Sequence, residues 1–171
     1  MNASDQMKIT LRRDPVPQTE FYYQQQFEIY HTSYLIWDRE TWETVLSTCA
    51  VYRVDVNGAN AGDVILEEKG KGIFTIVDFG LLPEFQGKGV GRAVLNEIMR
   101  MSWKLTAVTR EETLPFFLKC NFVLRRRIRD YYERGVEGFD VVWADRDESE
   151  DRERSTRSQV TPRSNAKGKK I

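Results

Sequence analysis

The chain has 171 residues, 40% of them apolar and 30% charged, and its 26 basic and 26 acidic side chains cancel. Such a chain can bury one core, and its balanced charge excludes a global field that attracts nucleic acid or an anionic membrane. No segment approaches the ~20 apolar residues that span a bilayer, and the N-terminus lacks the apolar stretch of a secretory signal. We expect a cytoplasmic monomer or homodimer with no membrane partner, and nucleic acid is not the expected partner.

Few residues in the chain are suited to metal binding or to nucleophilic catalysis. The two cysteines, Cys49 and Cys120, have no metal-ligand neighbour at a useful spacing, and His31 is the single histidine. The sequence therefore predicts two buried thiols and no metal site. Nothing beside His31 indicates a nucleophile that would depend on it.

The N-terminal half of the chain combines short strands with two helices. Residues 7–12 alternate like a strand, and residues 19–30, after two prolines, predict a helix. Residues 38–47 predict a second helix that begins at a capping aspartate. Two strands follow, at residues 49–56 and 61–68, and the Asn-Gly pair between them predicts a turn.

The second half alternates strands and helices. A buried strand at residues 73–82 precedes an amphipathic helix at residues 89–102, whose apolar face is formed by Val90, Val94, Ile98 and Met101, with Ala93 beside them. The remaining elements are a strand at residues 104–109, a short helix at residues 111–119, a strand that begins with residues 121–128, and a last strand at residues 139–143. The predicted order is β-α-α-β-β-β-α-β-α-β-β, a mixed α/β (α+β) domain.

A change in composition marks the C-terminal boundary of this domain. We place the domain at residues 1–144 and a tail at residues 145–171, which has almost no large apolar side chains. Residues 145–153 carry six acids and two bases, whereas residues 154–171 carry six bases and no acid. Such a segment does not offset the entropic cost of ordering its backbone, so we expect a disordered tail. The alternative is a basic arm for nucleic acid or another acidic partner.

Three glycines between the buried strand and the amphipathic helix carry the chemical information. Gly87, Gly89 and Gly91 lie in the segment LLPEFQGKGVGRAVL and let the backbone approach a ligand closely. The unpaired N–H groups of the first helical turn suit a phosphate or pyrophosphate. Lys88 and Arg92 add positive charge there.

Two common phosphate-binding motifs do not fit this segment. The P-loop needs a glycine five residues before the Gly-Lys pair and Ser or Thr after it, but Lys88 is followed by Gly89. The dinucleotide motif has a third glycine or alanine at a spacing that Arg92 breaks.

QGKGVG instead matches the pattern Q/R-x-x-G-x-G/A, and the segment resembles the coenzyme A motif of the GNAT superfamily of N-acetyltransferases. PFFLKCNFVL resembles the second motif of that family, and RDYYERGVEGFDVVW is similar to the last hairpin of its protein N-terminal branch. The likeness covers roughly residues 51–143.

The resemblance implies acetyl-coenzyme A as co-substrate and an amine as acceptor. In the family, the backbone N–H groups at the glycine turn hold the pyrophosphate, a glutamine supports the turn, and the edge of the preceding strand pairs with the pantetheine arm. A backbone N–H near Leu81 would polarise the acetyl carbonyl. The implied cofactor-binding residues here are Leu81, Leu82, Gln86, Gly87, Lys88, Gly89, Val90, Gly91 and Arg92.

The chain departs from the family where the catalytic groups are expected. Many members place a tyrosine that protonates the departing thiolate at the position of Phe117, and the usual Gly-Phe pair is Asn121-Phe122 here. Asparagine tolerates the left-handed conformation that this turn needs. Thr75 occupies a position where some members carry a glutamate. The remaining candidates for acid and base are Tyr131, Tyr132 and Asp78, with Glu111 and Glu112 as further carboxylates. Since Tyr131 and Tyr132 are consecutive in a predicted strand, we expect only one of them to face the acceptor, Tyr132 in preference.

The sequence thus predicts an N-acetyltransferase that moves an acetyl group to a primary amine by direct attack in a ternary complex. A peptide or protein α-amine is the favoured acceptor. The alternative is a non-catalytic GNAT-fold regulator that binds coenzyme A, which the phenylalanine at position 117 supports.

Overall fold

The computed structural model describes residues 6–145. The predicted tail therefore lies outside the described residues, except for Asp145. Within the described range, no helix is long and apolar enough to cross a membrane.

The described residues form a single seven-stranded sheet with four α-helices and two short 3-10 helices. The strands are β1 (Ile9–Arg13), β2 (Ala50–Val56), β3 (Ala59–Gly70), β4 (Ile73–Leu81), β5 (Lys104–Thr109), β6 (Val123–Glu133) and β7 (Val136–Ala144). The helices are α1 (Thr19–Ile29), η1 (Ser33–Leu35), α2 (Arg39–Thr48), η2 (Pro83–Phe85), α3 (Val90–Arg100) and α4 (Leu114–Lys119). This order confirms the predicted succession of strands and helices.

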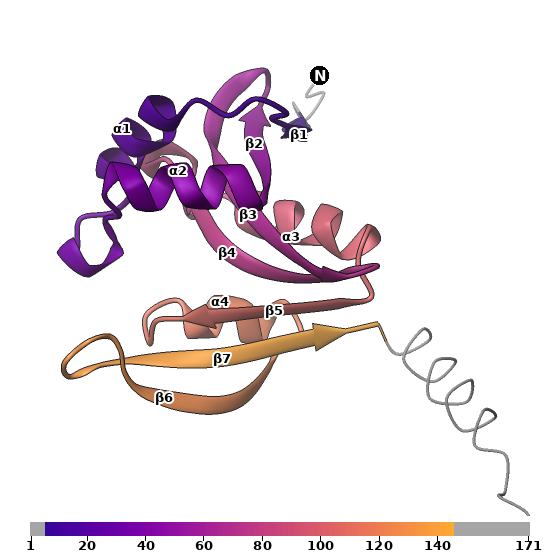
Figure 1. The fold of residues 1–171 in the computed structure, drawn as a ribbon. Coiled ribbons are helices and arrows are strands. Elements are labelled where there is room, and N and C mark those ends of the chain that lie inside the picture. The colour runs from indigo at the N-terminus through magenta and orange to yellow at the C-terminus, as the bar shows by residue number, and fades with distance from the viewer. Residues whose placement is uncertain (1–5, 146–171) are drawn as a thin grey trace, which may run out of the picture.

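The strand order of the sheet is β1-β2-β3-β4-β5-β7-β6. All neighbouring pairs are antiparallel except β4 and β5, which run parallel and are connected by α3. The boundary between these two strands divides the sheet into two groups, and Figure 1 shows β1 to β4 above and β5 to β7 below. A mostly antiparallel sheet with one parallel crossover is the mixed fold that the sequence predicts.

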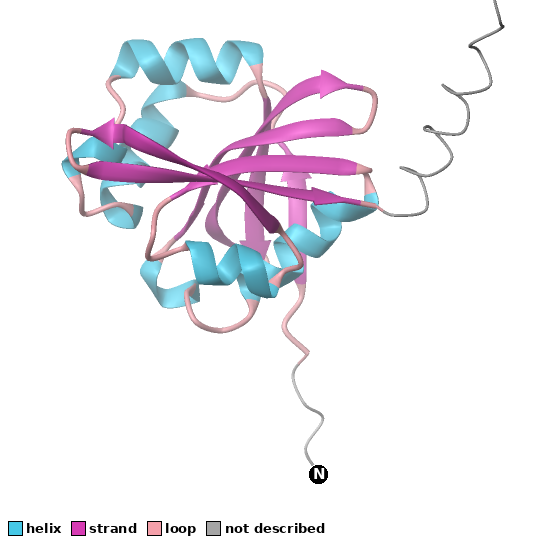
Figure 2. Ribbon diagram, turned by 90° about the horizontal axis from the view of Figure 1, so that it is seen from below, coloured by secondary structure: helices cyan, strands magenta, loops and turns pink. Residues whose placement is uncertain are grey.

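Helices cover both faces of the sheet (Figure 2). On one face, Tyr22 of α1 and Trp42 of α2 pack with Val51 and Ile65 of the sheet in a small core. On the other face, a larger core is formed by α3, α4 and the opposite side chains of the strands. Because alternate residues of β3 point to opposite faces, Val64 and Leu66 belong to this second core. Helices α1 and α2 thus pack on one face of the sheet, and helices α3 and α4 pack on the other.

Helix α3 differs in one position from the predicted apolar face. Val90, Val94 and Ile98 are buried as expected, but Met101 is 39% exposed and Leu95 is fully buried. Met101 follows the last residue of α3 with φ −99° and ψ 4°, outside the helical geometry. The 3.6-residue periodicity therefore no longer applies at Met101. The expectation of two buried thiols is half correct, since Cys120 is buried and Cys49 is partly exposed.

The turn after α4 has the conformation that the sequence requires. Asn121 has φ 66°, in the left-handed region. Asparagine adopts that region more readily than most residues, although less readily than glycine. The turn that the family forms with glycine is therefore retained here with Asn121, and Phe122 behind it is buried.

Candidate functional site

Strands β4 and β5 separate halfway along their length. Their parallel pairing runs from Ile73 opposite Lys104 to Ile76 opposite Ala107 and stops there. We call the ends beyond this point, residues 77–81 of β4 and 108–109 of β5, the β4–β5 fork. In Figure 1 the two strands lie together at the right and part toward the left.

A β-bulge in β4 accounts for the fork. Asp78 lies opposite Ile65 of β3, but Ile76 lies opposite Leu66, so Val77 is an extra residue. A bulge bends its strand and increases the local twist. Beyond Val77, β4 follows β3, whereas β5 continues beside β7 as far as Thr109 opposite Phe139. The edge of β4 in the fork is left without a strand partner in the described chain.

The backbone of this edge presents polar groups toward the fork. The N–H of Leu82 donates to the carbonyl of Ala61 at 2.8 Å, on the β3 side. Since successive residues of a strand alternate in direction, the N–H and C=O groups of Leu81 and Phe79 point to the fork. The carbonyl of Leu81 there accepts a hydrogen bond from Nε2 of Gln86 at 2.8 Å. Gln86 thereby ties the glycine turn to the end of β4.

The glycine turn leads from this edge into α3. Gly87 and Gly89 have φ 70° and 81°, and a Cβ on either would have no atom within 4 Å. These positions need glycine for their left-handed backbone and leave open space above it. Gly89 is the N-cap residue of α3, and its carbonyl accepts from the N–H of Ala93 at 3.2 Å. The preceding N–H groups of the first turn have no acceptor within the helix and lie at its positive end.

The other residues of the turn join α3 to α4. A Cβ on Gly91 would lie 3.1 Å from the ring of Phe116, so glycine permits close packing of the two helices. The guanidinium of Arg92 donates to the carbonyl of Lys119 at 3.0 Å, at the end of α4. Lys88 is exposed in the turn, and Val90 is buried in the larger core. The cation at the turn itself is therefore Lys88, while the Arg92 side chain reaches toward α4.

Replacement of Gln86 tests the support of this turn. We expect Gln86→Ala to raise the Kd for acetyl-coenzyme A about fivefold, because a net hydrogen bond contributes about 1 kcal/mol. Gln24→Ala is the matched control, since Gln24 also makes one exposed side-chain hydrogen bond, to Glu20 on α1 at 2.7 Å. Calorimetric titration measures both. Equal dissociation constants for the parent and the two variants would contradict a supporting role for Gln86.

Asp78 and Tyr30 form a polar pair at the start of the fork. Tyr30, directly after α1, donates its hydroxyl hydrogen to Oδ1 of Asp78 at 2.6 Å. The hydroxyl lies against β4 because residue 80 is glycine, where a Cβ would approach Tyr30 Oη to 3.1 Å. Burial raises the pKa of Asp78, although hydrogen bonds from Asp63, Tyr30 and the Phe79 backbone oppose that rise. Burial and the Asp78 charge raise the pKa of Tyr30. Asp78 thus has the environment of a carboxylate with increased basicity.

Two further tyrosines connect the walls on either side of the fork. Tyr132 of β6 donates its hydroxyl hydrogen to the carbonyl of Val108 in β5 at 3.0 Å. Its ring lies 5.6 Å from that of Tyr34 in η1. Burial raises the pKa of Tyr132, and the positive charge of Arg110 opposes this rise for both Tyr132 and Tyr30. The α1–α2 connection and the β6–β7 hairpin, which both lie at the left of Figure 1, are therefore joined by the ring contact of Tyr34 with Tyr132.

Tyr131 and Tyr132 do not point to opposite faces, so the expectation of simple alternation is wrong. Their ring centroids are 4.9 Å apart in an edge-to-face contact. Asp130 has φ 51°, and the β6–β7 ladder is irregular between Ile128 and Glu133. This irregular backbone removes the strict two-residue period. Tyr131 is 48% exposed and lies over Gly138, where a Cβ would approach its ring to 2.7 Å.

The remaining residues considered for catalysis lie outside this group. Thr75 bonds to Thr106 at 2.8 Å in the paired part of β4 and β5. Glu111 and Glu112 are exposed. Phe117 is 7% exposed and packs edge-to-face against Phe122, with ring centroids 5.1 Å apart. Among residues 6–145, no group of three or more His, Cys, Asp or Glu could hold a metal ion.

Most of the described residues match a known protein family. The model of the acetyltransferase (GNAT) family matches residues 5–122. The chain belongs to the GNAT acetyltransferase family. It is accordingly an acyltransferase, and the fork and glycine turn lie within the matched range. The match begins well before the sequence motifs, at residue 5, and it ends before β6.

Solved structures share the fold of this acetyltransferase. They include the ribosomal-protein-S18-alanine N-acetyltransferase of Escherichia coli, at a TM-score of 0.66 and 16% identity over 80% of this chain and 94% of that chain. Ard1 of Thermoplasma volcanium has a TM-score of 0.62 and 17% identity over 80% and 97% of the two chains. A GNAT acetyltransferase of Elizabethkingia anophelis, solved with acetyl-coenzyme A bound, has a TM-score of 0.61 and 13% identity over 80% and 97%. None of the curated proteins compared with the chain gives a match.

Proposed function

We propose that this acetyltransferase moves the acetyl group of acetyl-coenzyme A to a primary amine, and that a peptide α-amine is its acceptor. The observation that carries the proposal is the fork. It joins an unpaired strand edge, a left-handed glycine turn at a helix N-terminus and a carboxyl group of increased basicity. The first two features fit the arm and pyrophosphate of coenzyme A, and the third fits removal of a proton from an amine.

The donor side of the proposal depends on backbone groups. The N–H groups from Gly87 to Arg92 would hold the pyrophosphate, with Lys88 as the neighbouring cation. On the open edge, the N–H and C=O groups of Phe79 would pair with the pantetheine arm. The N–H of Leu81 would also polarise the thioester carbonyl, and such a donor stabilises the charge that develops on the oxygen. The open space above Gly87 and Gly89 supports this arrangement.

The acceptor side depends on Asp78 and Tyr30. As the amine nitrogen forms its bond to the acetyl carbon, its proton would pass to Asp78, directly or through the Tyr30 hydroxyl. The C–S bond then breaks and coenzyme A leaves as a thiolate. A thiol has a pKa of about 8.5, so this leaving group does not require a general acid. The position of Tyr132 beside the fork supports Tyr132 as a candidate proton donor to the departing thiolate, with Tyr131 as the alternative.

The chemistry of amines favours an α-amine over a lysine side chain. An α-amine has a pKa of about 7.7–8.0 and is substantially neutral near pH 7.4, whereas a lysine with a pKa of about 10.4 is neutral about one time in a thousand. A single carboxylate is a sufficient base for the α-amine, because much of that amine is already neutral. One structural neighbour supports the same class by its name, the ribosomal-protein-S18-alanine N-acetyltransferase.

An acceptor panel tests the proposal. Release of coenzyme A is measured with peptides that carry a free α-amine, with the same peptides blocked at the N-terminus and carrying one lysine, and with polyamines. We expect the α-amine peptides to react at least about tenfold faster near pH 7.4, given the difference in neutral amine. Faster lysine acetylation would reject the acceptor class. Tight coenzyme A binding without turnover on any amine would favour the regulatory alternative.

A further inference from the structure

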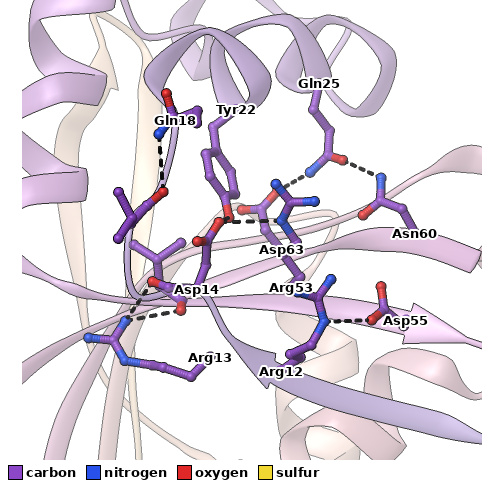
Figure 3. A network of polar contacts seen from close by, with 12 residues as sticks. Arg12, Arg13, Asp14, Gln18, Tyr22, Gln25, Arg53, Asp55, Asn60 and Asp63 are labelled. Atoms are coloured by element: carbon purple, nitrogen blue, oxygen red, sulfur yellow. Dashed lines mark hydrogen bonds and ion pairs between the residues drawn. The ribbon is translucent and has the colours of Figure 1, made fainter. Parts of the chain in front are cut away.

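Asp63 is a buried carboxyl group that the proposed reaction does not use. It lies on β3 and is 2% exposed. Its Oδ1 accepts a hydrogen bond from Nε2 of Gln25 at 2.6 Å, and Oε1 of Gln25 accepts from Nδ2 of Asn60 at 2.7 Å. Figure 3 shows Gln25 of α1 between these two side chains. Gln25 thus donates a hydrogen bond to one oxygen of Asp63 and leaves the other oxygen without a donor.

Asp63 has a second carboxyl group, that of Asp78, as a neighbour on the same face of the sheet. Oδ2 of Asp63 is buried and has no donor among the described side chains. Asp63 and Asp78 are diagonal neighbours on one face of the sheet, since Asp63 lies opposite Gly80 and Asp78 opposite Ile65. Both carboxyl groups are buried, and the charge of Asp78 acts on Asp63. Two carboxylates have four acceptor oxygens and no donor, so a proton on one of the two groups would give the unpartnered oxygen a role as a donor and would remove the repulsion between two buried charges.

We propose that Asp63 is a positioning residue that holds this proton and donates it to Asp78, so that Asp78 remains the single ionised carboxylate of the pair. Asp78 then accepts two O–H donors, Tyr30 on one side and Asp63 on the other. The inference rests on the proposed role of Asp78 as the base. It adds that Asp63 sets the pH range in which Asp78 is free to accept a proton from the amine.

The surroundings decide which of the two groups is protonated. Burial raises the pKa of Asp63 well above its ordinary value, and the charge of Asp78 adds to this effect. For Asp78, the donors Asp63 and Tyr30 oppose the effect of burial. The groups that face the pair are Gln25 and Tyr30 from the α1 side, with Arg110 acting on Tyr30. When Asp78 takes the amine proton, both carboxyl groups are neutral, and the proton later returns to solvent.

The stability of Asp63→Asn tests the protonation state without any activity measurement. In the unfolded chain Asp63 ionises near its ordinary pKa of about 3.9, whereas in the folded chain it keeps its proton. Protonated Asp63 therefore contributes to the stability of the parent in full below about pH 3.9. This contribution is lost as the pH rises toward the pKa of Asp63 in the folded chain. Asparagine has no such loss and retains both hydrogen bonds. We expect the melting temperature of Asp63→Asn to gain about 5 °C or more on the parent between pH 4 and pH 8.

Asp14→Asn is the control for this measurement because its shift has the opposite sign. Burial acts to raise the pKa of Asp14, but Tyr22 and Arg53 lower it on balance. Asp14→Asn should therefore lose stability relative to the parent as the pH rises through the acid range. Parallel melting curves of the parent and Asp63→Asn from pH 4 to pH 8 would overturn the proposal.

The pH dependence of kcat/KM tests the effect on Asp78. Asp63→Asn still offers a donor to Asp78 and should retain the parent's acid limb. Asp63→Leu removes the donor, so the acid limb should move upward by about one pH unit. An unchanged limb in folded Asp63→Leu would also overturn the proposal. If no amine is acetylated, the proposed function fails while the melting experiment still decides whether Asp63 holds a proton.

Discussion

Gly89→Glu should abolish binding of acetyl-coenzyme A while leaving the fold in place. The substitution puts a carboxylate at the N-cap of α3, where the unpaired N–H groups are expected to hold the pyrophosphate. A Cβ at Gly89 meets no atom within 4 Å, so the direct cost to the fold is the left-handed backbone at φ 81°. That cost is roughly 1–2 kcal/mol. Thermal stabilisation by acetyl-coenzyme A measures the loss.

Gly58→Glu provides a closely matched control. Gly58 has φ 82°, and a Cβ there also meets no atom within 4 Å, but it lies in the β2–β3 turn. Both variants should therefore lose similar stability, and only Gly89→Glu should lose the stabilisation by acetyl-coenzyme A. If the ligand stabilises the two variants equally, the glycine turn does not bind the pyrophosphate.

Asp78→Asn should lower kcat by about 100-fold or more, because general base catalysis by a positioned side chain typically contributes about 10²–10⁴-fold. Asparagine keeps an oxygen that accepts from Tyr30, so the hydrogen bond of 2.6 Å has a replacement. The Kd for acetyl-coenzyme A should stay unchanged, since the turn and the strand edge supply the donor contacts. Steady-state turnover of the best α-amine peptide measures the effect.

Asp55→Asn is the control carboxylate for that experiment. Asp55 lies on β2 in an ion pair with Arg12 at 3.2 Å, away from the fork. Its replacement should leave kcat within about a factor of two, as expected for an exposed ion pair worth less than about 1 kcal/mol. A kcat for Asp78→Asn within threefold of the parent would mean that water or another residue accepts the proton.

The order of elements and the glycine turn could be predicted because both are local features of the sequence. Apolar periodicity marks α3, and the left-handed glycines mark the turn before it. The fork could not be predicted in this way. It depends on the extra residue Val77 in the register between β3 and β4, and register is a property of two strands.

The acid–base candidates were predicted only in part for the same reason. Asp78 could be named from its strand, but Tyr30, Asp63 and Arg110 come from three other segments of the chain. Their proximity is a tertiary fact that no sequence spacing records. The prediction that Tyr131 and Tyr132 point to opposite faces was wrong, because the left-handed backbone at Asp130 interrupts the two-residue period of the strand. Conformations of this kind are uncommon for aspartate and have no reliable local signal.

The contact between Tyr34 and Tyr132 has a consequence for how new acceptor preferences can arise. It joins two surface connections, the α1–α2 segment and the β6–β7 hairpin, and neither connection sets the pairing of β3 with β4 or the glycine turn. Under the proposed function, we expect exchange of residues in these connections to alter which amine is acetylated while the backbone proposed to bind acetyl-coenzyme A stays the same. We therefore expect acceptor range and acetyl-donor binding to be separable traits, open to independent selection and to engineering by segment exchange.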